Sequence, residues 1–299
     1  MKKLICTLLV SLLLITSVSP AFAISKSTNA ISALSASVTS NEFPNAYIKQ
    51  RFVANPKSLE SFSLLKDGKN VGYVTATAYV EETYEILNSK PMITSSRLLS
   101  KKEVKTIGEQ NFSDINSAMS SFSTTKHKHK VRGKFSMTFT VKKYSNQYKL
   151  QLINNWDING FWNSGSNGPA AGPDYMGFAW GGGFDYDNYD ADTENSENYH
   201  STPDVADISP NGGIAWSFDD LQWGSHTNIW VKNSSCWTTI GKNTLTGKGN
   251  TTSVVGEYIH TWKDVQGSLS FSTSGDIGIN YSIKDKKWSL KLSISGIPY

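Results

Sequence analysis

The chain has 299 residues, with 29 Lys and Arg against 25 Asp and Glu and a formal net charge of +4. Apolar residues make up 38% and aromatic residues 12%, which argues against a disordered protein, since disorder needs low hydrophobicity and high net charge. A charge of +4 over this length is also too weak for a polybasic nucleic-acid binder. We therefore expect a folded protein without a nucleic-acid partner.

The first 23 residues have the pattern of a secretory signal peptide. Two lysines precede an apolar run from Leu4 to Val18, and Ala21-Phe22-Ala23 supplies the small residues of a cleavage site. A membrane anchor is the alternative, but the run is shorter than the ~20 residues that cross a bilayer. We predict an exported, extracellular protein, cleaved after Ala23, with no transmembrane segment once the signal is removed. The mature chain keeps one cysteine, Cys236, which we expect to be a small buried residue.

Charge divides the mature chain unevenly. Residues 24–149 hold 19 basic and 9 acidic residues, whereas residues 150–231 hold 12 acidic residues and no Lys or Arg. This difference predicts two structural units, joined where Lys126-His127-Lys128-His129-Lys130 offers five ionisable side chains with nothing apolar to bury. A metal-binding histidine pair and a processing site are the alternatives there. The expected parts are a signal peptide (1–23), a flexible Ser/Ala/Thr-rich segment (24–45), a basic mixed α/β unit (46–125), a basic linker (126–134) and an aromatic-rich β domain (135–299).

The mixed N-terminal unit contains one strand signal and two helix signals. Residues Val71 to Val80 form a β-prone run. Ser100-Lys101-Lys102-Glu103 fits a capping box, in which the serine side chain accepts the amide of Glu103 and the glutamate reaches back. We expect a short helix from there to about Gln110, and a second helix from Ser113 to Phe122.

The C-terminal part reads as strands with one apolar face. Apolar residues take every second position from Phe135 to Val141, and again from Tyr148 to Leu152 after a polar turn. The tail repeats this pattern in Ile277–Ile283 and Trp288–Ile294. These alternations predict two hairpins in a mainly β fold, an antiparallel β-sandwich or open barrel with one solvated sheet face.

An acidic, aromatic-rich stretch is the strongest candidate for a metal site. It holds five carboxylates within ten residues, which are Asp185, Asp187, Asp190, Asp192 and Glu194. Clustered carboxylates repel one another, and Ca²⁺, which takes 6–8 oxygen ligands, would relieve the repulsion. The stretch is not an EF-hand, because Thr193 stands where that motif needs glycine. A hydrated acidic loop, or salt bridges to the basic N-terminal unit, are the alternatives.

Large rings beside polar groups predict a carbohydrate surface. Trp162, Trp180 and Trp223 lie near glycine, asparagine or aspartate in turn-like sequence, so we expect them to be exposed. Asp219 and Asp220 would contact sugar hydroxyls beside them. Adjacent acids face opposite sides of a strand, so these two are a poor pair for a glycosidase.

The catalytic motifs that we sought are absent from the sequence. It contains no His-Glu-x-x-His zinc motif and no Gly-x-Ser-x-Gly elbow. We therefore expect a secreted, non-enzymatic binding protein that recognises a glycan or another cell-envelope polymer. The alternatives are a hydrolase that uses carboxylates among Asp185, Asp187, Asp219 and Asp220, and a membrane-active toxin.

Overall fold

The structure is a computed structural model that describes ten segments of the chain. These segments are 34–56, 68–87, 90–112, 128–157, 173–223, 228–242, 251–262, 267–274, 276–282 and 286–298. They all belong to one compact unit, Ile31–Tyr299. The predicted signal peptide and the predicted helix from Ser113 to Phe122 lie outside the described residues.

Strands make up most of the described chain, and they alternate with short turns. The strands are β1 (Ser35–Thr39), β2 (Ile48–Ala54), β3 (Lys69–Leu87), β4 (Lys90–Leu98), β5 (Lys128–Tyr144), β6 (Gln147–Asp157), β7 (Pro173–Trp180), β8 (Phe184–Asn195), β9 (His200–Ser201), β10 (Asp204–Ser209), β11 (Gly213–Asp219), β12 (Leu221–Trp223), β13 (Asn228–Lys242), β14 (Thr251–Thr261), β15 (Leu269–Ser272), β16 (Gly278–Tyr281) and β17 (Lys287–Pro298). The helical elements are α1 (Lys101–Ile107) and the 3₁₀ turn η2 (Glu109–Phe112).

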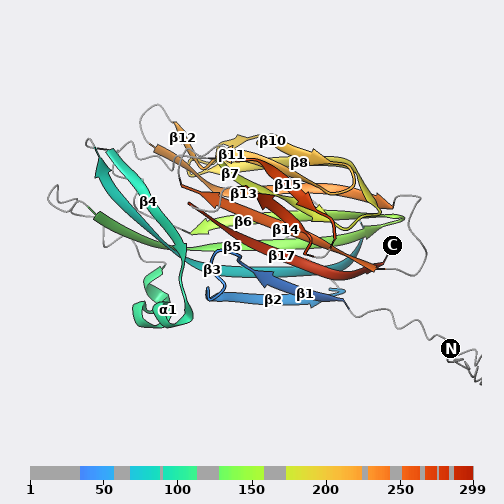
Figure 1. Ribbon diagram of the computed structural model, residues 1–299, viewed down its shortest axis with the longest axis horizontal. Helices are drawn as coiled ribbons and strands as arrows, with labels where there is room; N and C mark the ends of the chain where they lie inside the picture. The colour runs from blue at the N-terminus through green and yellow to red at the C-terminus, as the bar shows by residue number, and fades with distance from the viewer. Residues whose placement is uncertain are drawn as a thin grey trace, which may run out of the picture. The chain divides into compact units, whose positions relative to one another are not determined.

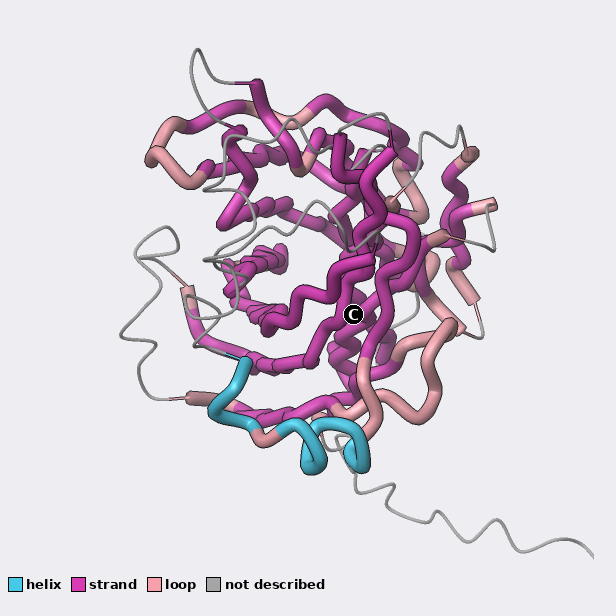
Figure 2. Tube along the Cα trace, turned by 90° about the vertical axis from the view of Figure 1, so that its left-hand side faces the viewer, coloured by secondary structure: helices cyan, strands magenta, loops and turns pink. Residues whose placement is uncertain are grey.

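The strands form an antiparallel β-sandwich, which confirms the predicted mainly β fold. One sheet has six strands in the order β1-β17-β14-β7-β11-β10. The other has nine, with the path β2-β3-β5-β6-β13-β8-β9, β4 on β3 and β12 on β13. The tube view in Figure 2 shows the two layers of strands, with the helical elements beside them.

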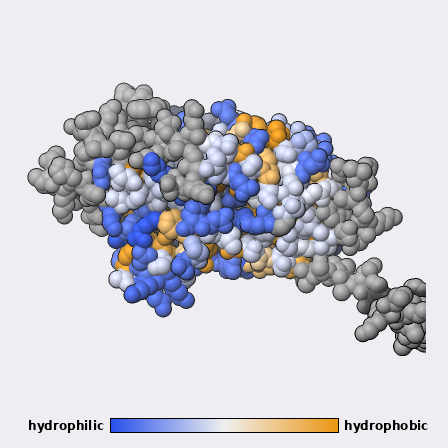
Figure 3. Space-filling model, viewed as in Figure 1, coloured by the Kyte–Doolittle hydropathy of each residue, from blue (hydrophilic) through white to orange (hydrophobic). Residues whose placement is uncertain are grey.

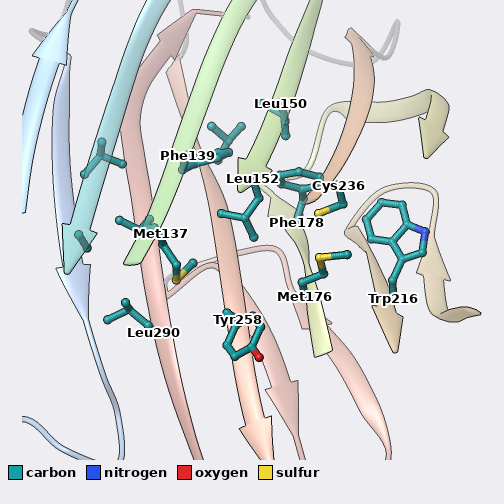
Figure 4. Close-up of a cluster of buried hydrophobic side chains, with 14 of the residues drawn as sticks. Met137, Phe139, Leu150, Leu152, Met176, Phe178, Trp216, Cys236, Tyr258 and Leu290 are labelled. Atoms are coloured by element: carbon teal, nitrogen blue, oxygen red, sulfur yellow. The ribbon is translucent and has the colours of Figure 1, made fainter. Parts of the chain in front are cut away.

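The core lies between the two sheets, where the alternating residues of both inner faces meet. Phe135, Met137, Phe139 and Val141 of β5 are fully buried, as the sequence pattern predicts. Figure 4 shows side chains of β5 and β6 meeting those of β7, β14 and β17. The predicted β5–β6 hairpin is confirmed, with Ser145 in the left-handed region at φ 47°. Cys236 is buried in this core, as expected.

The six-stranded sheet is covered on its outer face as well. The β15–β16 hairpin packs there through Leu269, Phe271 and Ile279 against apolar residues of β7 and β14. As a result β14 is buried on both faces from Val254 to Thr261. A strand buried on both faces can hold ionisable side chains away from water on either side.

The predicted helix at Ser100 is confirmed as α1, and its capping box is complete. The Ser100 hydroxyl accepts from the Glu103 amide, and the Glu103 side chain accepts from the Ser100 amide at 2.9 Å. The helix ends at Ile107, before Gly108 at φ 86°, and the 3₁₀ turn η2 continues to Phe112. Phe112 is buried against Tyr79, so this element anchors to the nine-stranded sheet.

The basic segment 126–134 differs from the linker that the sequence predicts. From Lys128 onward it is the first part of β5, which pairs with β3 down to Glu85. Lys130 and Arg132 each donate to Glu81, whose side chain is 3% exposed, at 2.9 Å. The basic side chains therefore have an acidic partner from far away in the sequence, and the N-terminal strands share one sheet with the C-terminal ones.

Two further expectations differ from the structure. Part of the predicted flexible segment, Ser35–Thr39, is strand β1, because Ala36 and Val38 pack on the core and the backbone pairs with β17. The tail strands do not form a hairpin, since β16 pairs with β15 and β17 pairs with β14. Alternation specifies which face of a strand is buried, but it does not specify the partner strand.

The face drawn in Figure 3 is mostly hydrophilic, with small apolar patches. The exposed large apolar side chains among the described residues are Tyr144, Tyr189, Tyr199 and Val205. No extended apolar surface is therefore apparent on that face, and polar side chains have to supply any recognition there.

Candidate functional site

A group of ionisable side chains is buried between the sheets at one end of the six-stranded sheet. Asp174 is the second residue of β7, His260 is near the end of β14, and Asp220 follows directly on β11. Because β7 lies between β14 and β11, the register brings these three residues together. One nitrogen or oxygen atom from each lies within 4.8 Å of the others. We call Asp174, Asp220 and His260, with Glu82 of β3, the core acid–histidine cluster.

Asp174 is held by hydrogen bonds on both of its oxygens. The Thr261 amide donates to Oδ1 at 2.9 Å, and the Tyr258 hydroxyl donates to Oδ2. The indole of Trp156 in turn donates to the Tyr258 oxygen at 3.0 Å. His260 Nδ1 lies 3.1 Å from each Asp174 oxygen. This fully buried carboxylate is therefore fixed in place by donors.

The other two carboxyl groups flank the imidazole on its two sides. His260 Nε2 lies 3.3 Å from Glu82 Oε1, across the sandwich, while Nδ1 lies 3.9 Å from Asp220 Oδ2. Two buried atoms of the described cluster form no hydrogen bond, namely Asp220 Oδ1 and His260 Nε2. Buried polar atoms are nearly always paired in native proteins, so these two call for an explanation.

The electrostatics of the cluster follow from burial and like charge. Burial raises the pKa of Asp220 well above its usual range, and the neighbouring Asp174 carboxylate raises it further. Burial by itself lowers the pKa of His260, but Asp174 and Glu82 outweigh it and raise that pKa well above its usual range. Burial, followed by the charge of Asp174, raises the pKa of Tyr258. At neutral pH the cluster therefore holds protons on groups that would release them in water, apart from Tyr258, which keeps its proton in either setting.

The arrangement suits cation binding better than nucleophilic catalysis. Among the described residues no serine, threonine or cysteine side chain is hydrogen-bonded to His260, so the cluster lacks the nucleophile of a catalytic triad. Both oxygens of Asp174 accept from protein donors inside the core. The cluster offers one ring nitrogen and carboxylate oxygens, which are metal ligands.

A second candidate is a polar hollow on the outer face of the nine-stranded sheet, which we call the outer hollow. It has a volume of about 190 Å³ and is lined by Ile153, Asn155, Asp192, Glu194, Asn233, Ser234 and Ser235. The register explains it: Ser235 of β13 lies between Ile153 of β6 and Asp192 of β8, so a small side chain sits between two larger ones. The next row pairs Asn155, Asn233 and Glu194.

Carboxylates and amides form a hydrogen-bonding frame around the outer hollow. Asn233 Nδ2 donates to Glu194 Oε2 at 2.7 Å, and Lys232 Nζ contacts Glu194 Oε1 at 2.8 Å. Lys232 holds the pKa of Glu194 below its usual range. Asp192 Oδ2 lies 2.7 Å from His200 Nδ1. Half-buried Trp237 occupies the neighbouring position on the same face of β13, with Lys149 Nζ 4.0 Å from its ring centroid.

The acidic stretch of the calcium prediction forms strand β8, not the loop considered above. Asp185, Asp187 and Asp190 are exposed, and Asp192 and Glu194 border the outer hollow. Among the described residues, side-chain contacts to this row come from Gln147, His200, Lys232 and Asn233, and no ion pair with a basic residue of the N-terminal strands is found there. Nothing in the described part of the chain tests whether calcium binds there, so that stays a prediction.

The predicted ligand-binding residues are not gathered at one place. Trp180 is fully buried, which corrects the prediction of an exposed ring; its indole donates to the Phe184 carbonyl at 3.2 Å. Trp162 and the side chain of Trp223 lie outside the described part of the structure. Asp219 is exposed while Asp220 turns into the core, so the two face opposite sides as expected.

The sequence analysis missed Asp174 and His260 as site residues. The sequence does contain one indication for His260. It has the same parity as Val254 and Tyr258, so it lies on the same face of β14, and that face is buried. A histidine and an aspartate on apolar faces are not enough to predict contact, because the two residues are 86 positions apart in the sequence. Only the sheet order brings them together.

Comparisons with known proteins assign no family. No family model matches the chain, and no curated protein matches it. The solved structures to which it is similar include AvmM, which catalyses macrocyclization in alchivemycin A biosynthesis (10% identity, 45% of this chain, 78% of that chain, TM-score 0.19). Two others are the T6 backbone pilin of serotype M6 Streptococcus pyogenes (9%, 81%, 63%, 0.25) and the N-terminal domain of the Streptococcus gordonii adhesin Sgo0707 (9%, 89%, 84%, 0.14).

No helix in the described part of the chain is long and apolar enough to cross a membrane.

Proposed function

We propose that this chain is an extracellular, non-enzymatic binding protein whose outer hollow recognises saccharide units of a glycan or cell-envelope polymer. The observation that carries the proposal is the grouping of Asp192, Glu194 and Asn233 around Ser235 on a solvent-facing strand surface. The secretory pattern of residues 1–23 supports an extracellular setting.

The chemistry of the outer hollow matches a sugar. A sugar ring presents several hydroxyl groups, each a donor and an acceptor, and carboxylates and amides together supply both roles. Here Asp192 and Glu194 accept, while Asn155 and Asn233 can do either. At about 190 Å³ the hollow is smaller than a typical drug-sized pocket, so it suits a single sugar unit of a chain that continues outside it. Trp237 adds an aromatic edge one row away.

The geometry argues against hydrolysis at Asp219 and Asp220. A glycosidase needs two carboxyl groups facing one bond, whereas Asp219 is exposed and Asp220 points into the core. Asp174, which lies beside Asp220 in the core acid–histidine cluster, is completely buried. The described carboxylates therefore offer no accessible pair for that reaction at Asp219 and Asp220.

The test is retention of the purified mature protein on insoluble polysaccharides and bacterial cell walls. Replacing Asp192→Ala together with Asn233→Ala removes hydrogen bonds worth ~1–2 kcal/mol, so we expect binding to weaken by about fivefold to thirtyfold. Asp185→Ala is the matched control, since Asp185 is an exposed acid of the same strand that does not line the hollow. The proposal fails if no polysaccharide retains the protein, or if both variants bind equally well.

A further inference from the structure

The core acid–histidine cluster has the spacing of metal ligands, and it lies apart from the outer hollow. We infer that Asp174, Asp220 and His260 bind one divalent transition-metal ion, of the zinc or manganese class, between the two sheets. His260 Nδ1 is 3.1 Å from Asp174 Oδ2 and 3.9 Å from Asp220 Oδ2. Two ligands bound at about 2.1 Å around a tetrahedral ion are about 3.4 Å apart, which lies between these distances. The nitrogen ligand favours zinc over calcium, which prefers oxygen ligands alone, and the two carboxylates are ligands that manganese also accepts.

One unsatisfied atom provides a second indication. Asp220 Oδ1 is buried without a hydrogen-bond partner, although the Asp220 side chain as a whole is 16% exposed. Within the described residues no lysine or arginine forms an ion pair with Asp174 or Asp220. A bound cation would give the Asp220 carboxyl a partner, and because metal ligands must be deprotonated it would displace the protons that the cluster otherwise holds.

The groups around the three ligands are arranged as an outer shell. With the ion on Nδ1, a neutral imidazole carries its proton on Nε2, which faces Glu82 Oε1 at 3.3 Å. This is the carboxylate–histidine–metal arrangement, in which the carboxylate fixes the tautomer and orients the ring. The Thr261 amide and the Tyr258 hydroxyl fix the Asp174 carboxylate in the same way. The site is therefore oriented before any ion arrives.

The test is metal retention by the full mature protein. The protein is treated with chelator, incubated with zinc or manganese, desalted, and analysed for metal by mass spectrometry; we expect a single ion per chain and a higher melting temperature. Asp220→Asn, which keeps the side-chain shape, should lower the affinity at least about tenfold. The matched control is Asp219→Asn, the adjacent exposed acid, which should bind as the unchanged protein does.

Cobalt keeps the proposal testable even if the Asp220→Asn chain misfolds. Co²⁺ in the unchanged protein should show visible absorption with a nitrogen ligand, and the spectrum should be lost in His260→Gln. The proposal is overturned if the unchanged protein retains no zinc or manganese. It is equally overturned if folded Asp220→Asn retains as much metal as Asp219→Asn, because the ion would then be bound elsewhere.

Discussion

Two groups of acidic side chains in this molecule have similar composition and opposite surroundings. The core acid–histidine cluster places Asp174, Asp220 and Glu82 around one imidazole between the sheets. The acidic row of β8 places its carboxylates on the outer face, with His200 and Lys232 beside it. The core group is almost entirely buried, with only Asp220 partly exposed at 16%, whereas the row of β8 faces water.

This difference reverses the direction of the pKa shifts. In the core, burial raises the pKa of Asp220, so that carboxyl keeps its proton at pH values where it would be ionised in water. On the outer face, Lys232 lowers the pKa of Glu194, which stays ionised. The number of clustered carboxylates therefore does not decide what a cluster does. Access to water and the nearest cation decide it.

The largest expected effect is the removal of Asp174. Asp174→Ala leaves the Thr261 amide, the Tyr258 hydroxyl and His260 Nδ1 buried without their acceptor. Breaking a buried charged network costs ~3–5 kcal/mol, so we expect a loss of that size in the free energy of unfolding by urea. Asp185→Ala on the exposed row should change it by less than ~0.5 kcal/mol. Equal losses in the two variants would contradict the comparison.

Glu257 gives a second test of how burial shifts the pKa of a carboxyl group. It is buried on the opposite face of β14 from His260. Burial raises its pKa to about 7, against the lowering effects of the Ile279 amide and the charge of Lys291. Below pH ~4.5 the carboxyl is protonated in both the folded and the unfolded chain. Between pH ~4.5 and 7 only the unfolded chain releases the proton, so the free energy of unfolding falls as the pH rises, by about 3 kcal/mol in all.

Replacing Glu257→Gln isolates this contribution. The amide can still accept from the Ile279 N–H, and it does not titrate. The stability of the variant relative to the unchanged protein should therefore increase by about 3 kcal/mol from pH 4.5 to above pH 7, as measured by urea unfolding at each pH. A difference that stays constant across this range would show that Glu257 does not titrate as a buried acid.

Local patterns in the sequence predict individual elements of this fold well. The alternation from Phe135 to Val141 predicts a half-buried strand, and the capping box at Ser100 predicts α1, because both depend on neighbours within a few residues. The pairing of β17 with β14 does not follow from such patterns, since many strands have equivalent apolar faces. Strand β1 is not predicted, for a related reason. Its Ser and Ala residues are small, so its apolar alternation is weak in the sequence, and the strand is identified only by its pairing with β17.

The candidate sites show the same limit. The acids of β8 stand out in the sequence because they are close together along the chain, and Asp220 stands out because it adjoins Asp219, although the sequence predicts a sugar contact for it and not a place in the core. Asp174 and His260 are 86 residues apart and meet only through the order of β7 and β14 in the sheet. The prediction for Trp180 is wrong because it depends only on neighbours in the chain. Gly181 is typical of a turn and suggests exposure, whereas the ring packs into the core.

Calcium gives the smallest expected effect, and it tests the acidic row of β8 directly. Lys232 already compensates Glu194 and His200 already contacts Asp192, so an ion would add little, and extracellular sites commonly have dissociation constants of about 1 mM. Such a site raises stability by about 1.4 kcal/mol at 10 mM calcium, which shifts the melting temperature by a few degrees. The shift should disappear when Asp190→Asn and Asp192→Asn are combined.

Asp219→Asn serves as the control for this measurement, because Asp219 is an exposed acid that lies outside β8. It should keep the full calcium shift, since it removes the same charge from another strand. Identical melting of the unchanged protein in calcium and in chelator would remove calcium from the acidic row. The core acid–histidine cluster would be unaffected by that result, because its imidazole selects a different class of ion. Calcium and zinc therefore report separately on the exposed and the buried group.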